Sequence, residues 1–295
     1  MSEAIAITNQ KGGVGKTTTV VNLAVALVQQ GKRVVVVDAD PQANTTSQLA
    51  QQAVDPGNNI CAMMDKVLQQ APIMRGEGVV KGKYGVDLVP SSIVLAGKEM
   101  QLSEQVPAGR ERSSVLKKYT DTIKGDYDFM LFDTNPSLGN LTINALTAAD
   151  SVLIPLEPAT FSMDGLDQLA QTIAAIRRTS NPGLAIKGAL FTRYNPQFKS
   201  TKIIESTLRT HYSSLMKIYE NSIPARAAAV NAQYERQSVF EYDKHNAVSK
   251  AYASLAAEIA APAGRRQGKE DKAHGDHNHE SGRGRSSAPS GATVR

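Results

Sequence analysis

The sequence has one cysteine, no tryptophan and no long uninterrupted run of apolar residues. With Cys61 alone, a single chain cannot form a disulfide framework, a multi-cysteine metal site or an iron–sulfur site. A membrane-spanning helix needs about 18 apolar residues in succession, so none is predicted, and the N-terminus lacks the charged-then-apolar pattern of a secretory signal. These absences predict a soluble, cytoplasmic protein with no membrane partner.

Positive charge is unevenly distributed along the chain, whose formal net charge is +5 at pH 7. Residues 1–176 hold 14 basic and 18 acidic side chains, a net of −4, whereas residues 177–250 hold 12 and 5, a net of +7. A local basic excess favours nucleic-acid phosphates. Any DNA is therefore expected on the C-terminal part of the folded body.

Residues 262–295 differ in composition from the rest of the chain, with few large apolar residues and much Gly, Ser, His and charge. Such a segment cannot offset its ordering entropy by burial. It is predicted to be a disordered polar and basic tail after a single domain at residues 1–261. His274, His277 and His279 could bind a metal, but a solvated polar tract explains them better, and no metal is assigned there.

Short apolar runs alternate with helical patterns in residues 1–261, which is typical of a parallel sheet with helices on both faces. The runs are near-continuously apolar, as buried parallel strands are. Strands are expected at residues 4–8, 33–38, 86–89, 129–133, 152–155 and 187–191, and helices at residues 16–29, 110–123, 141–148, 164–178, 202–211 and 247–260. The predicted fold is α/β, with a doubly wound, mostly parallel sheet.

The sequence TNQKGGVGKTTT, residues 8–19, follows the first expected strand and opens the first expected helix, as a phosphate-binding loop must. Its glycines let backbone N–H groups and the helix N-terminus face a polyphosphate. Lys16 would neutralise phosphate charge, and the Thr17 hydroxyl would ligate magnesium. The motif therefore predicts a fold of the P-loop NTPase type.

Two letters of this loop depart from the usual pattern. Gln10 stands where the first glycine is expected, and Lys11 stands where a small residue is expected. Lys16 alone accounts for the binding of phosphate, so a second lysine on the N-terminal side of the loop needs another explanation.

Carboxylates end two of the apolar runs. Asp133 closes YDFMLFD, and Asp38 and Asp40 close RVVVVDAD. All three should emerge at the carboxyl edge of the sheet beside the loop. We assign Asp133 and Asp38, with Thr17, to the magnesium site, and Asp40 to orienting the attacking water.

Five motifs together resemble the ParA branch of the deviant Walker A ATPases, which segregate plasmids and chromosomes. They are KGGVGKTT, DADPQANTT, DTNPSLGNLTINAL, FTRYNP and IPARAAAV…VFEYD, in collinear order across residues 1–261. The resemblance implies ATP and Mg²⁺ as cofactors and slow ATP hydrolysis that a ParB-like centromere-binding adaptor stimulates. It also implies nonspecific binding to double-stranded DNA and association with the nucleoid.

The resemblance explains the second lysine. In this family it reaches across a homodimer interface to ATP held by the other subunit, and two facing triphosphates need such neutralisation. Lys11, Lys16 and Asp40 are then the catalytic residues. The loop contacts to nucleotide are Lys11, Gly12, Gly13, Val14, Gly15, Lys16, Thr17 and Thr18.

The resemblance also places Arg193, Pro224 and Arg226 around the adenine, although Arg193 fits an ordinary surface arginine equally well. For DNA, the expected contributors are Lys199, Lys202, Arg209, Lys217 and Arg226. The family usually has two prolines after the magnesium aspartate, where this chain has Asn135 and Pro136.

Other functions remain as alternatives. A MinD-like membrane-surface positioning ATPase needs a C-terminal amphipathic helix, and the segment RRQGKEDKAHGDHNHESGRGR has no apolar face. An ATPase of the nitrogenase iron-protein type needs paired cysteines. A small-molecule kinase stays open because a phosphate loop does not specify its acceptor.

Overall fold

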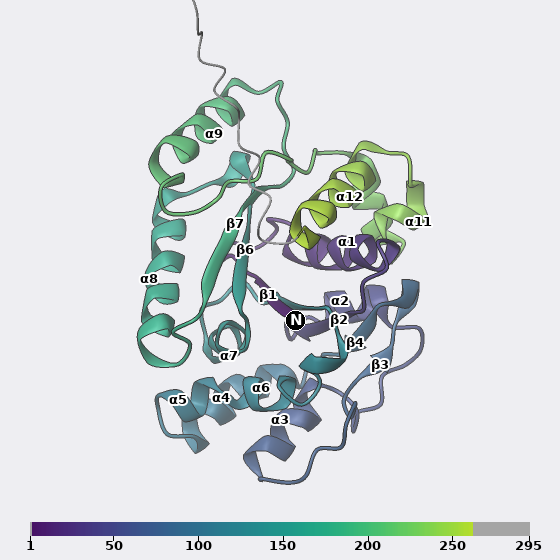
Figure 1. Ribbon diagram of the computed structural model, residues 1–295, viewed down its shortest axis with the longest axis vertical. Coiled ribbons are helices and arrows are strands. Elements are labelled where there is room, and N and C mark those ends of the chain that lie inside the picture. The colour runs from purple at the N-terminus through teal and green to yellow at the C-terminus, as the bar shows by residue number, and fades with distance from the viewer. Residues whose placement is uncertain (1, 262–295) are drawn as a thin grey trace, which may run out of the picture. The chain divides into compact units, whose positions relative to one another are not determined.

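The apolar runs form the centre of one sheet in the computed structural model, which describes residues 2–261 (Figure 1). In that part of the chain the sheet has seven strands in the order β3-β4-β2-β5-β1-β6-β7, and every neighbouring pair is parallel except β3 and β4. The strands are β1 (Glu3–Ile7), β2 (Val34–Ala39), β3 (Val80–Lys81), β4 (Asp87–Val89), β5 (Phe129–Thr134), β6 (Ser151–Leu156) and β7 (Ala185–Phe191).

Alternate residues of each strand face opposite sides, so the sheet separates two apolar cores. Ile5 and Ile7 face one core, whereas Ala4 and Ala6 face the other. The first core lies under α1 (Lys16–Gln29), α2 (Asn44–Leu49), α10 (Ala227–Tyr234), α11 (Val239–Asp243) and α12 (Ala247–Ala260). The second lies under α3 (Ile60–Leu68), α4 (Leu95–Gln105), α6 (Val115–Thr120), α7 (Asn140–Ala148), α8 (Met163–Thr179) and α9 (Lys199–Tyr212). The predicted doubly wound α/β fold of the P-loop NTPase type is confirmed.

The helix predicted at residues 110–123 is broken. It forms α5 (Arg110–Ser113) and α6, separated at Ser114. The side chain of Asn144 in α7 donates to the carbonyl of Arg112 and accepts from the amide of Leu116, so it takes over backbone groups at the break. A tertiary hydrogen-bond partner therefore replaces local helix continuity here.

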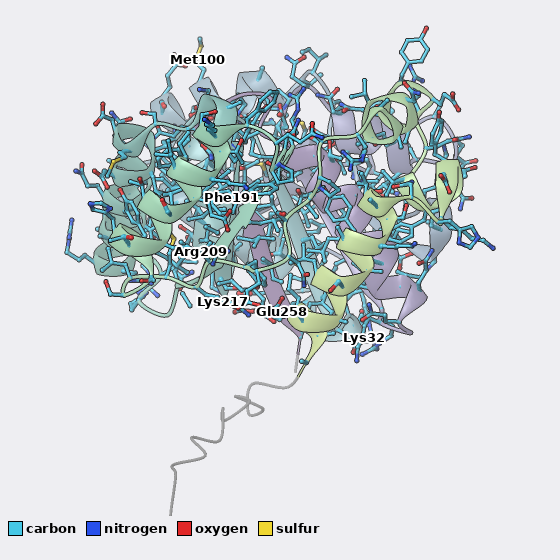
Figure 2. All side chains as sticks on the ribbon, turned by 90° about the horizontal axis from the view of Figure 1, so that it is seen from above. Lys32, Met100, Phe191, Arg209, Lys217 and Glu258 are labelled. Atoms are coloured by element: carbon cyan, nitrogen blue, oxygen red, sulfur yellow. The ribbon has the colours of Figure 1, made fainter. Side chains whose placement is uncertain are left out.

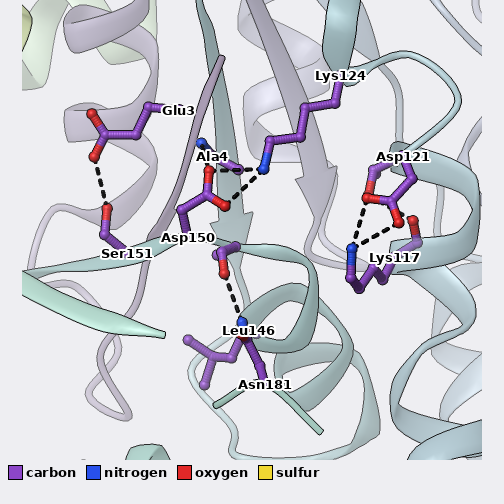
Figure 3. A network of polar contacts seen from close by, with 11 residues as sticks. Glu3, Ala4, Lys117, Asp121, Lys124, Leu146, Asp150, Ser151 and Asn181 are labelled. Carbon is purple, nitrogen blue, oxygen red and sulfur yellow. Dashed lines mark hydrogen bonds and ion pairs between the residues drawn. The ribbon is translucent and has the colours of Figure 1, made fainter. Parts of the chain in front are cut away.

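Hydrogen bonds also fix the edge of the sheet where the parallel strands begin (Figure 3). The Asp150 carboxylate accepts from the Ala4 amide at 2.7 Å and from the Lys124 ammonium at 2.7 and 2.8 Å. Ser151 donates to Glu3 beside it. Because β1 is held at its start, the loop that leaves its other end emerges at a defined place.

The predicted tail at residues 262–295, with His274, His277 and His279, lies outside the described residues. Within residues 2–261, no helix combines the length and apolar character needed to cross a membrane.

Candidate nucleotide-binding site

The loop between β1 and α1 bends at two glycines. Gly13 and Gly15 have φ angles of 78° and 84°, in the left-handed region that disfavours side chains. Gly15 is also the residue that precedes α1, and a Cβ there would lie 3.6 Å from Cβ of Thr192. The strand–turn–helix context expected from the sequence is therefore present, with the N-terminus of α1 opening at the loop.

Side chains at the ends of the sheet tether the loop. Thr192, directly after β7, donates its hydroxyl to the carbonyl of Val14 at 2.7 Å. Asn9 donates its amide to the carbonyl of Pro155 in β6 at 2.8 Å. Two strands that are distant in sequence thus fix the beginning and the middle of the loop.

Lys16 is almost buried, with 7% of its surface exposed. Its ammonium donates to the carbonyl oxygens of Asn9 and Lys11, both at 3.1 Å. Burial lowers the pKa of Lys16, and the nearby carboxylates of Asp133 and Asp40 oppose that shift. The loop therefore holds a partly desolvated cation, which is the group an incoming phosphate needs.

Asp133 lies at the carboxyl end of β5 and is fully buried. Its Oδ2 accepts hydrogen bonds from the hydroxyls of Thr17 at 2.8 Å and Thr45 at 2.7 Å, whereas Oδ1 has no hydrogen-bond partner among residues 2–261. Burial raises the pKa of Asp133 to about 6. A buried carboxylate oxygen without a partner is unfavourable, and Thr17 with Asp133 is a donor set that suits Mg²⁺ or its waters. The residues present therefore fit a magnesium ion.

Asp38 lies opposite Asp133 in the pairing of β2 with β5. Both its oxygens accept hydrogen bonds: Oδ2 from the Thr46 amide at 2.8 Å and hydroxyl at 2.7 Å, and Oδ1 from the Asp40 amide at 3.2 Å. Burial, with the neighbouring Asp133, raises its pKa to about 8. These bonds close the turn that leads into α2. A magnesium contact of Asp38 stays a prediction.

Asp40 is 7% exposed and lines the phosphate-side cavity, a space of about 290 Å³. One of its carboxylate oxygens accepts from the Gln42 amide at 2.9 Å, which orients the side chain. The cavity is lined by Gly12, Gly13, Gly15, Lys16, Thr17, Thr18, Asp40, Gln42, Asn44, Pro136 and Gln233. The structure therefore brings six of the eight predicted loop residues together with the predicted water-orienting carboxylate, whereas Lys11 and Val14 line a different cavity.

Lys11 lines a different cavity, of about 200 Å³, together with Asn9, Glu157, Phe161 and Leu166. Lys11 is exposed, whereas Lys16 is buried. The two lysines of one loop therefore face two separate spaces.

The three residues predicted around the adenine line a third cavity, of about 570 Å³. Arg193, Pro224 and Arg226 border it, and so do Gly15 and Thr18 of the loop and α1. Arg193 has a φ of 48°, and its guanidinium lies 3.5 Å from the Glu157 carboxylate. This cavity shares Gly13, Gly15, Thr18 and Gln233 with the lining of the phosphate-side cavity, so a base bound in one would adjoin phosphates bound in the other.

The five cations predicted to contact DNA are not equivalent. Lys199 and Lys202 on α9 are exposed, as is Arg226. Arg209 instead donates to Glu205 at 3.0 Å and to the carbonyls of Ile218 and Tyr219 at 3.4 Å.

Lys217 is also held by internal contacts. It forms an ion pair with Glu258 on α12, and its ammonium lies 4.5 Å from the centre of the Tyr219 ring (Figure 2). On α9, Lys199 and Lys202 are therefore the cations without a described ion pair, whereas Arg209 and the half-exposed Lys217 are paired with Glu205 and Glu258.

Sequence reasoning assigned no role to Thr45, Thr46, Thr192 or Asn9. Thr45 and Thr46 lie in the quoted motif DADPQANTT, where paired hydroxyls after a strand-ending carboxylate are a usable signal. Thr192 contacts the loop only because β7 ends beside it, and no local pattern shows this.

The fold and this loop together define a P-loop nucleotide-binding protein. Residues 2–186 match the family described as AAA domain. The chain is 36% identical to the chromosome partitioning protein ParA of Caulobacter vibrioides (strain NA1000 / CB15N). The alignment covers 268 residues, which are 90% of this chain and 96% of that protein. It is 35% identical to the sporulation initiation inhibitor protein Soj of Bacillus subtilis (strain 168), over 88% of this chain and 99% of Soj.

A solved structure is similar as well. The crystal structure of cobyrinic acid a,c-diamide synthase from Mycobacterium smegmatis, with bound ATP analogue and magnesium, superposes with a TM-score of 0.73 at 30% identity, over 88% of this chain and 94% of that one. The chain belongs to the ParA-type family of partitioning ATPases. The resemblance predicted from the motifs is thereby confirmed.

Proposed function

We propose that the protein is an ATP-dependent DNA-partitioning ATPase that segregates a plasmid or chromosome. ATP and Mg²⁺ are its cofactors, and the ATP-bound form is a homodimer. The observation that supports this most directly is the different placement of the two loop lysines. Lys16 lines the phosphate-side cavity, and Lys11 lines a separate one. The support from relatives is the shared family and the ATP analogue with magnesium in the M. smegmatis structure.

The chemistry follows from groups already in place. Bound Mg²⁺ would supply positive charge at the phosphate oxygens. That charge would lower the barrier to the attack of water on the γ-phosphate and to the departure of ADP. Thr17 and Asp133 hold the ion or its waters, Lys16 and the loop N–H groups bind phosphate, and Asp40 orients the attacking water. The cavity beside Arg193, Pro224 and Arg226 receives the adenine.

Dimerisation would depend on nucleotide because triphosphates near an interface repel until cations neutralise them. Lys11 supplies that cation to the ATP of the second copy, and twofold symmetry supplies the contact twice. Hydrolysis, stimulated by a ParB-like adaptor, removes the contact and releases the dimer.

DNA binding is proposed to use the exposed cations Lys199, Lys202 and Arg226, and to place the protein on the nucleoid. Phosphate contacts carry no sequence information, so binding should be insensitive to sequence and steeply dependent on salt. A dimer presents the set twice, which is why binding should require ATP.

Binding to a mixed-sequence duplex, measured with Mg²⁺ and either ADP or a non-hydrolysable ATP analogue at several salt concentrations, tests this function. We expect binding with the analogue only, and the same affinity for unrelated duplexes. A chain ending at Ala261 is the matched control, since it retains all three cations. Equal binding with ADP, or failure of the shortened chain to bind, would contradict the proposed interface.

A further inference from the structure

The side chain of Asn9 joins the loop to the sheet. Its amide donates to the carbonyl of Pro155 in β6 at 2.8 Å, and its Oδ1 accepts from the backbone amide of Lys11 at 3.0 Å. One planar group therefore connects the end of a rigid strand to the residue that is proposed to cross a dimer interface.

The carbonyl of Lys11 is held from the other side, by the ammonium of Lys16 at 3.1 Å. In the proposed function Lys16 serves the phosphates, so this second contact competes with nucleotide. The Asn9 contact does not, because Asn9 lines the cavity shared with Lys11 and not the phosphate-side cavity. Asn9 can therefore keep its hydrogen bond to the Lys11 backbone while nucleotide is bound.

We propose that Asn9 is the positioning residue for Lys11: it bridges the Lys11 backbone to β6, so that the ammonium starts from a fixed point when it reaches a second copy of the chain. This inference rests on the proposed function. Its physical basis is that a loop residue fixed before association loses less conformational entropy on association. Lys11 is an exposed residue, at the surface where a second copy of the chain would approach.

The test compares wild type, Asn9→Ala and Lys11→Ala. Dimer dissociation constants are measured by sedimentation with Mg²⁺ and a non-hydrolysable ATP analogue, and ADP affinity is measured separately below the concentration of dimerisation. We expect Asn9→Ala to weaken dimerisation about tenfold, the size expected for one or two net hydrogen bonds. It should lower ADP affinity by a smaller factor, because the backbone carbonyl of Asn9 that accepts from Lys16 is kept.

Two variants separate positioning from general support of the fold. Asp55→Ala removes a turn of the same kind, in which Asp55 accepts from the Gly57 amide at 2.8 Å, and it should leave dimerisation unchanged. Asn9→Asp keeps an acceptor for Lys11 but has no donor for Pro155, so it should not restore dimerisation. Full restoration by Asn9→Asp would overturn the bridge to β6.

The outcomes also distinguish this inference from the function beneath it. If Lys11→Ala abolishes dimerisation while Asn9→Ala dimerises like wild type, the positioning role is wrong and the proposed function stands. A loss of ADP affinity in Asn9→Ala as large as its loss of dimerisation also overturns it. If Lys11→Ala itself dimerises normally, the cross-interface role is wrong and the positioning role with it.

Discussion

At the scale of single residues, burial gives the carboxylates of the site different properties. Asp38 and Asp133 are fully buried and face each other across adjacent strands, and burial raises both pKa values. Asp40 is 7% exposed and, unlike Asp38 and Asp133, is among the residues that line the phosphate-side cavity. In the proposed function Asp133 therefore serves the cation, and Asp40 is the carboxylate placed to orient the attacking water.

The first prediction is a pH dependence of stability without nucleotide. Because the pKa of Asp38 is raised to about 8 in the folded protein, the folded state binds more protons than the unfolded state between pH ~4 and pH 8. The contribution of Asp38 to stability is therefore present at low pH and lost as pH rises through about 8, with a slope of at most about 1.4 kcal/mol per pH unit. Urea unfolding at pH 5.5 and 8 should show a smaller pH difference for Asp38→Asn than for wild type, and equal differences would refute the assignment.

The second prediction concerns Asp40. Asp40→Ala should keep nucleotide binding and nucleotide-dependent dimerisation, and lower hydrolysis at least a hundredfold, because a water-orienting group acts mainly in the transition state. Steady-state phosphate release and analogue binding, measured on the same preparation, check it. If hydrolysis stays normal, Asp38 becomes the candidate, which its occupied oxygens make unattractive.

The third prediction concerns Lys16. Lys16→Ala removes the buried cation from the protein's own phosphate-side cavity, so affinity for ADP should fall by at least tenfold, as expected when a charged hydrogen bond worth about 1.5–3 kcal/mol is removed. Lys11→Ala, which changes the neighbouring cavity, is the control and should bind ADP nearly normally. Similar losses in both variants would show that the two lysines serve one site.

At the scale of elements, α9 carries the surface proposed for DNA. Lys199 and Lys202 are exposed within its first turn, whereas Arg209 near its C-terminal end is tied to Glu205 and to backbone carbonyls. A helix can therefore have several cations of which only some are free to meet phosphates.

The fourth prediction follows from that difference. Lys199→Glu with Lys202→Glu should weaken duplex binding and lower the slope of log affinity against log salt by about 0.9 for each phosphate that the variant no longer neutralises. Arg110→Glu with Lys118→Glu changes the net charge equally on α5 and α6, and serves as the matched control. The interface is misplaced if both double variants bind with the wild-type slope.

The elements also show what the sequence could predict. The parallel strands were found because their runs are apolar on both faces, and the loop, Asp133 and Asp40 were found because they follow those runs. The break at Ser114 could not be predicted from the local sequence, because the side chain that bonds the backbone there, Asn144, belongs to another helix. The two-residue β3 exists only through its pairing with β4. Likewise, the internal partners of Arg209 and Lys217 come from distant segments, which charge counting cannot reveal.

At the scale of the whole molecule, the account depends on a second copy of the chain. The loop is fixed from two sides by β6 and β7, its inner lysine serves its own cavity, and its outer lysine faces a separate one. An ATP-driven dimer gives both lysines a function, whereas a monomeric ATPase leaves Lys11 without one.

Nucleotide-driven dimerisation through Lys11 can be tested by sedimentation velocity of wild type and Lys11→Ala, each with Mg²⁺ and either ADP or a non-hydrolysable ATP analogue. We expect a monomer with ADP for both proteins, a dimer with the analogue for wild type, and a monomer with the analogue for Lys11→Ala. A wild-type protein with the same sedimentation coefficient in both nucleotides, or a Lys11→Ala dimer of normal affinity, would contradict it.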